Sequence, residues 1–153
     1  MSSNVASESQ QPATCTQTLR GGYAFTPEQG LQLATALARM VGEAPPADVD
    51  DYPTVLNQID DFLMNVPRDL GIQRVWNKNI PGADYVYFLA TTKRHRVKLP
   101  KEEMDRARTE PFHYCDPSVQ LKESDEDRLV KQVIQEETGV EVGPFQTVIW
   151  LDY

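Results

Sequence analysis

Apolar residues recur at helical spacing in three segments of the chain. The segments run from Thr26 to about Val41, from about Pro53 to Val66, and from Ser124 to Thr138. In each, apolar residues return every three or four positions, which predicts an amphipathic helix with one buried stripe. The expected stripes are Leu33, Leu37, Met40 and Val41 in the first helix, Val55, Leu56, Ile59, Phe62, Leu63 and Val66 in the second, and Leu129, Val130, Val133 and Ile134 in the third.

Polar residues and glycines at the ends of these segments support the same boundaries. Thr26 and Gln29 have the spacing of a capping box, and Ser124 is placed to cap the third helix. Gly42 and Gly139 follow the first and third segments, where a residue in the left-handed conformation closes a helix.

Three other segments read as strands. Residues 72–76 and 145–151 are rich in β-branched and aromatic residues. Residues 85–89 are almost continuously apolar, which predicts a central strand covered on both faces. The chain stays extended toward Leu99, either as one long strand or as a hairpin that turns near Lys93.

The order of these elements predicts an α+β fold. A short surface helix is expected to begin at Pro100, so the order is helix, helix, strand, strand, helix, helix, strand. This order lacks the strand–helix alternation of a doubly wound sheet. We expect a small, mostly antiparallel or mixed sheet of about three to five strands, packed against three amphipathic helices and one short surface helix.

The first 21 residues differ in composition from the rest of the chain. They are rich in Ser, Thr and Gln and contain no aromatic residue. Such a segment buries too little apolar surface to offset the entropy lost on ordering. We therefore predict a disordered tail over residues 1–21 and a single domain over residues 22–153.

Composition and charge limit the choice of compartment and partner. The formal net charge is −8, which disfavours binding to nucleic acid and to anionic membranes. The chain has two cysteines, no secretory leader and no apolar run long enough to span a bilayer. These features predict a soluble protein of the cytoplasm, with the nucleus as an alternative, and leave the oligomeric state open.

One segment of the chain is strongly basic. Residues 93–101 hold five of the 15 Lys and Arg residues and no acidic residue. In an extended strand, alternation is expected to bring Arg94, Arg96 and Lys98 to one face, where they would bind an anionic or acidic partner. Tyr85 and Tyr87 on a neighbouring strand would add a stacking surface if they shared that face. The alternative is an edge strand protected by charge.

The histidines and one cysteine form a second, weaker candidate site. His113 and Cys115 are close in sequence, and His95 lies in the basic segment. If the three residues met in one pocket, they would supply the groups of a Cys–His enzyme. No paired spacing of Cys and His is present, so we predict no metal site and no cofactor.

Residues 135–140 resemble the end of the Nudix box, the motif of a family of diphosphate hydrolases. The positions where that motif carries its arginine and a metal-binding glutamate are occupied by Gln132 and Val133. We therefore make no assignment to this family.

These observations favour a small acidic interaction or regulatory domain that binds a protein partner through residues 93–101. One alternative is an enzyme that acts on a small anionic substrate with His95, His113 and Cys115, and with an arginine holding the anion. Another alternative is a nucleic-acid-binding module that uses the same basic strand, against which the net charge counts.

Overall fold

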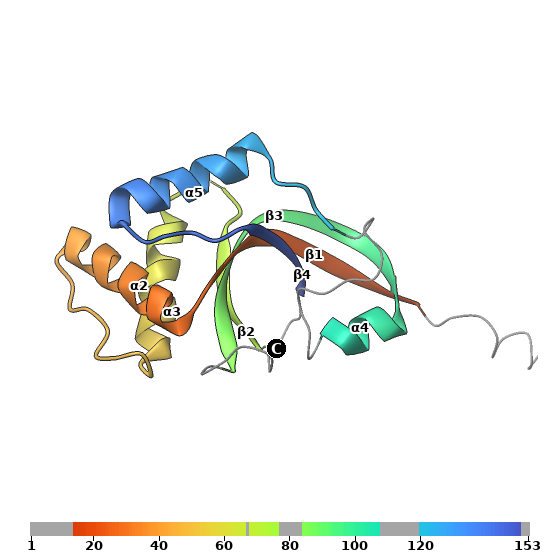
Figure 1. Cartoon of the computed structure of the whole chain (residues 1–153), viewed down its shortest axis with the longest axis horizontal. Coiled ribbons are helices and arrows are strands. Elements are labelled where there is room, and N and C mark those ends of the chain that lie inside the picture. The colour runs from red at the N-terminus through yellow and green to blue at the C-terminus, as the bar shows by residue number, and fades with distance from the viewer. Residues whose placement is uncertain (1–13, 67, 77–83, 108–119, 151–153) are drawn as a thin grey trace, which may run out of the picture.

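The computed structural model describes residues 14–66, 68–76, 84–107 and 120–150, which form an α+β fold as the sequence predicts (Figure 1). Helices α2 (Pro27–Val41), α3 (Tyr52–Met64) and α5 (Asp125–Thr138) gather at one end of a curved antiparallel sheet. The short helix α4 (Lys101–Ala107) lies at the other end. Among the described helices, none is both long and apolar enough to cross a membrane.

Four described strands form the sheet, in the order β2–β3–β1–β4. The long strands β1 (Thr14–Phe25) and β3 (Tyr85–Pro100) pair with each other at its centre. β2 (Gly71–Trp76) pairs with the first part of β3, and β4 (Phe145–Trp150) pairs with β1. The chain therefore continues beyond Lys93 as one strand rather than as a hairpin.

The central position of β1 corrects the predicted N-terminal boundary. The strand begins at Thr14, and Leu19 within it has no exposed surface. The prediction of disorder is thus wrong for residues 14–21, whereas residues 1–13 lie outside the described part of the chain. The physical reason is that β3 and β4 pair with both edges of β1 and satisfy its backbone groups, which composition alone does not reveal.

The helix boundaries follow from the caps predicted from sequence. The Thr26 side chain accepts a hydrogen bond from the Gln29 backbone, and the Gln29 side chain accepts one from the Thr26 backbone. Ser124 forms the equivalent capping box at the start of α5. Gly42 and Gly139 end α2 and α5 in the left-handed conformation, with φ of 73° and 72°. These predictions are confirmed.

The segment 85–89 is covered on both faces, as its composition predicts. Tyr87 and Leu89 belong to the cluster beneath the helices, whereas Val86 and Phe88 belong to a second cluster on the opposite face of the sheet. The exposed fraction of each of these four side chains is 5% or less. This segment is therefore the centre of the hydrophobic core.

Two glycines permit close approach of the backbone at this centre. A Cβ atom on Gly22 would lie 1.9 Å from the Leu89 carbonyl oxygen, so only glycine fits between β1 and β3 at this point. A Cβ atom on Gly30 would lie 2.3 Å from the Tyr87 ring, so the absence of a side chain lets α2 rest on that ring.

Candidate functional site

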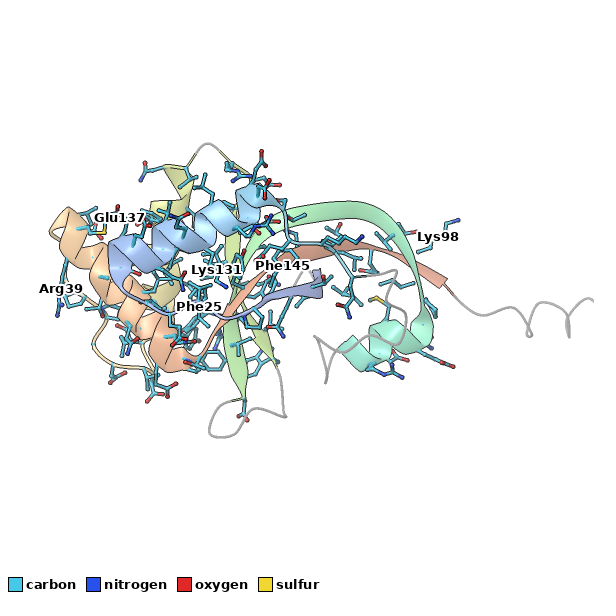
Figure 2. The ribbon with its side chains drawn as sticks, turned by 45° about the horizontal axis from the view of Figure 1, so that its top comes forward. Phe25, Arg39, Lys98, Lys131, Glu137 and Phe145 are labelled. Carbon is cyan, nitrogen blue, oxygen red and sulfur yellow. The ribbon has the colours of Figure 1, made fainter. Side chains whose placement is uncertain are left out.

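The basic segment, residues 93–101, lies mainly in the part of β3 that is paired on one edge only. β2 pairs with Tyr85 to Ala90, and none of the described strands pairs with that edge of β3 beyond Ala90. Lys98 is exposed and Leu99 is buried, while the side chains of residues 93–96 lie outside the described part. Lys98 lies far from Glu137 and from Arg39, at the end of the molecule away from α2 and α5 (Figure 2).

The change from two paired edges to one coincides with a bulge in β3. Gly71 pairs with Ala90, and the register to β1 shifts there so that Thr91 is the extra residue. Buried Arg20 donates hydrogen bonds to the carbonyl oxygens of Asp69 and Ala90, at 3.1 and 3.4 Å. Burial lowers the pKa of Arg20, and the negative charge of Asp69 opposes this effect. These contacts tie the chain entering β2 to the sheet at Ala90, beyond which no described strand pairs with this edge of β3.

A second register shift lies within the basic segment. Arg94 lies opposite Leu19, and Lys98 lies opposite Thr16. Over this stretch β3 therefore holds one more residue than β1, which is a bulge. The side chains of residues 93–96 lie outside the described part, so the expectation that Arg94, Arg96 and Lys98 share one face stays a prediction.

The two candidate tyrosines lie at the helix-covered end of β3. Tyr87 has no exposed surface, so the prediction that it offers a stacking surface is wrong. Tyr85 is half-buried and makes edge contacts with the rings of Tyr87 and Trp76, at centroid distances of 5.5 and 5.8 Å. The Arg74 guanidinium stacks 3.6 Å from the centre of the Tyr52 ring beside this cluster. Tyr87 thus packs within the core, whereas Trp76 and Tyr52 stay exposed beside it.

The structure does not describe where the histidine and cysteine candidates lie relative to one another. His113 and Cys115 lie outside the described residues, as does the side chain of His95. The catalytic hypothesis that uses them stays a prediction. Within the part of the chain that is described, no three or more His, Cys, Asp or Glu side chains gather in a way that would hold a metal ion.

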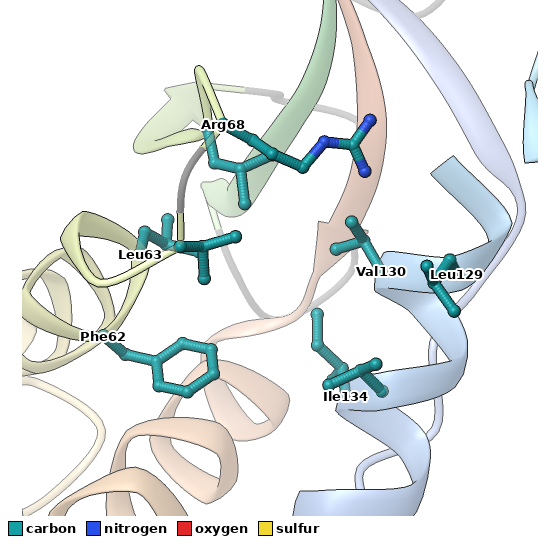
Figure 3. Close-up of a pocket in the computed structure, with 9 residues that line it drawn as sticks. Phe62, Leu63, Arg68, Leu129, Val130 and Ile134 are labelled. Carbon is teal, nitrogen blue, oxygen red and sulfur yellow. The ribbon is translucent and has the colours of Figure 1, made fainter. Parts of the chain in front are cut away.

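A hollow lined by apolar side chains opens between α3 and α5 (Figure 3). Phe62 and Leu63 of α3 face Val130 and Ile134 of α5 across it. Its volume is about 150 Å³, and its lining residues are Phe62, Leu63, Val66, Arg68, Leu70, Leu129, Val130, Val133 and Ile134. A cavity of about this volume accepts a benzene ring, so the hollow has room for one bulky apolar side chain.

A second hollow adjoins the first at Phe62, which lines both. It lies between α2 and α3, has a volume of about 350 Å³, and is lined by Leu37, Ala38, Met40, Val41, Glu43, Gln58, Asp61, Phe62 and Asn65. We call the two hollows together the groove. Met40 and Val41 expose 53% and 68% of their surface beside it, and Leu129 and Val133 expose 56% and 40%. So much exposed apolar surface in one place is typical of an interaction site.

Acidic side chains dominate the charge of the groove. Glu43 and Asp61 line the second hollow, and Glu137 borders the narrow space between α2, α3 and α5. The cation among the lining residues, Arg68, is paired with Glu126 at 2.6 Å. The groove is therefore apolar at its floor and negative around its rim.

Sequence reasoning missed the groove because it assigned these residues to the core. Leu129, Val133, Met40 and Val41 were expected in buried stripes, and the structure leaves all four exposed, so that part of the prediction is wrong. Periodicity shows which face of a helix is apolar, but the width of the neighbouring elements decides how much of that face is covered. The available signal was the width of the apolar stripes in the sequence, because a wide stripe has residues at its margin that a neighbouring element can leave exposed.

Asp127 holds α5, and with it one wall of the groove, against the sheet. Its buried carboxylate accepts hydrogen bonds from the Thr92 hydroxyl at 2.6 Å and from the Ser124 backbone N–H at 2.8 Å. Burial alone would raise the pKa of this carboxyl group, but hydrogen bonds from Thr92, Ser124 and Thr91 outweigh it and hold the pKa below its ordinary value.

Comparison of this chain with protein-family models, with curated proteins and with solved structures found no match.

Proposed function

We propose that this chain is a non-catalytic interaction domain that binds an acidic segment of a partner protein along the open edge of β3. The observation that supports this is the coincidence of two boundaries. β2 pairs with β3 only as far as Ala90, and the basic segment begins three residues later.

An open strand edge carries backbone N–H and C=O groups that an added strand satisfies. These groups provide affinity without regard to sequence, and side chains provide the selectivity. The basic residues of this segment would attract the carboxylates of an incoming acidic strand. An extended acidic peptide is therefore the class of partner that fits.

Charge and bulges also serve to keep strand edges from pairing in natural sheets. The charge of the probe separates the two roles. A protective edge would reject acidic and basic strands alike, whereas a binding edge would accept the acidic one.

The test uses a labelled peptide of alternating Glu and Val residues, and the same peptide with Lys in place of Glu. We expect the Glu peptide alone to raise fluorescence anisotropy, and to slow amide hydrogen exchange in residues 91–99. The variant Arg94→Ser/Arg96→Ser/Lys98→Ser should weaken binding about tenfold or more, because each lost cation removes an attraction across the edge.

The control removes the same charge elsewhere, in Arg39→Ser/Lys122→Ser/Lys131→Ser. If both triple variants bind the Glu peptide equally well, or if exchange is unchanged in residues 91–99, the edge is not the binding site.

A further inference from the structure

The structure assigns a second docking surface to this chain: we propose that the groove binds an amphipathic helix of a partner protein, with bulky apolar residues on one face and Lys or Arg residues beside them. This site is separate from the open edge of β3 and does not depend on it, because the two lie toward opposite ends of the molecule (Figures 1 and 2).

The walls of the groove favour a helix over a strand. α2, α3 and α5 form its sides, and helices satisfy their own backbone hydrogen bonds along their length. An extended segment laid between them would find few partners for its own N–H and C=O groups, which are costly to bury unpaired. A helical partner carries its backbone hydrogen bonds with it and presents side chains only.

The two hollows of the groove would each accept bulky apolar side chains of the partner helix, which we call its anchors. The first hollow has room for one large side chain, and the second, at about 350 Å³, has room for more. Phe62 lies between them and would contact both sets of anchors. Side chains that return every three or four residues along one helix face would meet such a pair of hollows.

The charge of the rim selects a basic partner. Glu43 and Asp61 are exposed at the groove, Glu137 is exposed beside it, and the one cation among its described lining residues, Arg68, already pairs with Glu126. An acidic helix would meet like charges here, whereas Lys or Arg residues flanking the apolar anchors would be attracted. Residues 1–13 of the chain itself do not fit this description, because they lack both basic residues and a run of bulky apolar ones.

The first measurement compares three labelled peptides of about 18 residues, long enough for five helical turns. One has Leu at helical spacing and Lys elsewhere, the second has Glu in place of Lys, and the third has the composition of the first in an order that forms no apolar face. We expect the Leu/Lys peptide to bind at least about tenfold more tightly than either of the others, and to bind more weakly as salt is added.

The second measurement tests the location without changing charge. Leu129→Gln/Val133→Gln alters two exposed residues of the groove and should weaken binding of the Leu/Lys peptide about tenfold or more. The control Gln132→Ala/Gln135→Ala changes exposed residues of the same helix outside the groove, and should stay within about twofold of the parent chain.

Three results would overturn the proposal. Equal binding of the Lys and Glu peptides would remove the charge argument. Equal binding by the groove variant and its control would place the peptide elsewhere. Sedimentation that shows a dimer of the parent chain, converted to a monomer by Leu129→Gln/Val133→Gln, would make a second copy the occupant. Arg94→Ser/Arg96→Ser/Lys98→Ser should leave binding of the Leu/Lys peptide intact, so the two proposed sites fail independently.

Discussion

The two halves of β3 belong to one continuous strand but have different surroundings. Tyr85 to Ala90 pairs with β2, Tyr87 to Ala90 pairs with β1 as well, and the segment has a buried cluster on each face. From Thr91 to Pro100, the described part of the sheet supplies pairing on one edge only, and the sequence becomes basic. One strand can therefore form part of the core in its first half and offer a candidate binding surface in its second half, with a bulge between the two.

The strongest test of this difference is an alanine substitution in each half of β3, compared by its effect on the free energy of unfolding. Phe88→Ala should lower the free energy of unfolding by about 3 to 5 kcal/mol, because it leaves a cavity in a fully buried cluster. Lys98→Ala, at an exposed position, should change it by no more than about 0.5 kcal/mol. Urea unfolding measures both. Similar losses would mean that the second half is as much a part of the core as the first.

The next largest effect is expected where the halves meet. Gly22→Ala should destabilise the protein by about 3 kcal/mol, because the added Cβ atom meets backbone atoms of Leu89, and β1 and β3 must move apart. Gly143→Ala is the matched control, since a Cβ atom there meets nothing within 4 Å. It should change stability by less than about 1 kcal/mol. A small effect of Gly22→Ala would show that the two strands separate easily.

The smallest of these effects concerns the attachment of α5 to the second half of β3. Asp127→Asn should lower stability at pH 7 by about 2 kcal/mol, because it weakens hydrogen bonds to a buried carboxylate. Asp125→Asn, in the same helical turn but 96% exposed in its side chain, should cost less than about 1 kcal/mol.

The pH dependence of this effect has a defined sign. The pKa of Asp127 lies below its ordinary value of 3.8 in the folded protein, so its contribution is complete above that pH and is lost as the pH falls through the folded pKa. The stability difference between the parent chain and Asp127→Asn should therefore shrink below about pH 4. A difference that is constant down to pH 2 would contradict the assigned shift.

The elements that sequence reasoning predicted well are those fixed by neighbours along the chain. The capping residues Thr26 and Ser124 act within one turn, and the apolar composition of residues 85–89 reports burial on both faces wherever the partners come from. β1 was missed along its whole length, Thr14–Phe25, because its partners lie far away in sequence. Its alternating threonines, which favour strands, were the available signal.

The candidate sites depend on how segments far apart in the sequence pack together, which a pattern of neighbouring residues does not show. Among the described strands, the edge of β3 beyond Ala90 has no partner because β2 has six residues and β3 has sixteen. The groove exists because α3 and α5 leave Leu129 and Val133 uncovered. Charge singled out the segment of the first proposed site, but the bulge within that segment is visible only in the register of β1 against β3.

The position of β1 has a consequence for synthesis on the ribosome. Leu19 lies opposite Ile149, so about 130 residues must be translated before this pair can form. Until then the edge of β1 that pairs with β4 has no partner in the nascent chain. Pairing of strands this far apart in sequence is slow. A chaperone that shields β1 during translation would therefore raise the yield of folded protein, and a pause of translation before β4 would lower it.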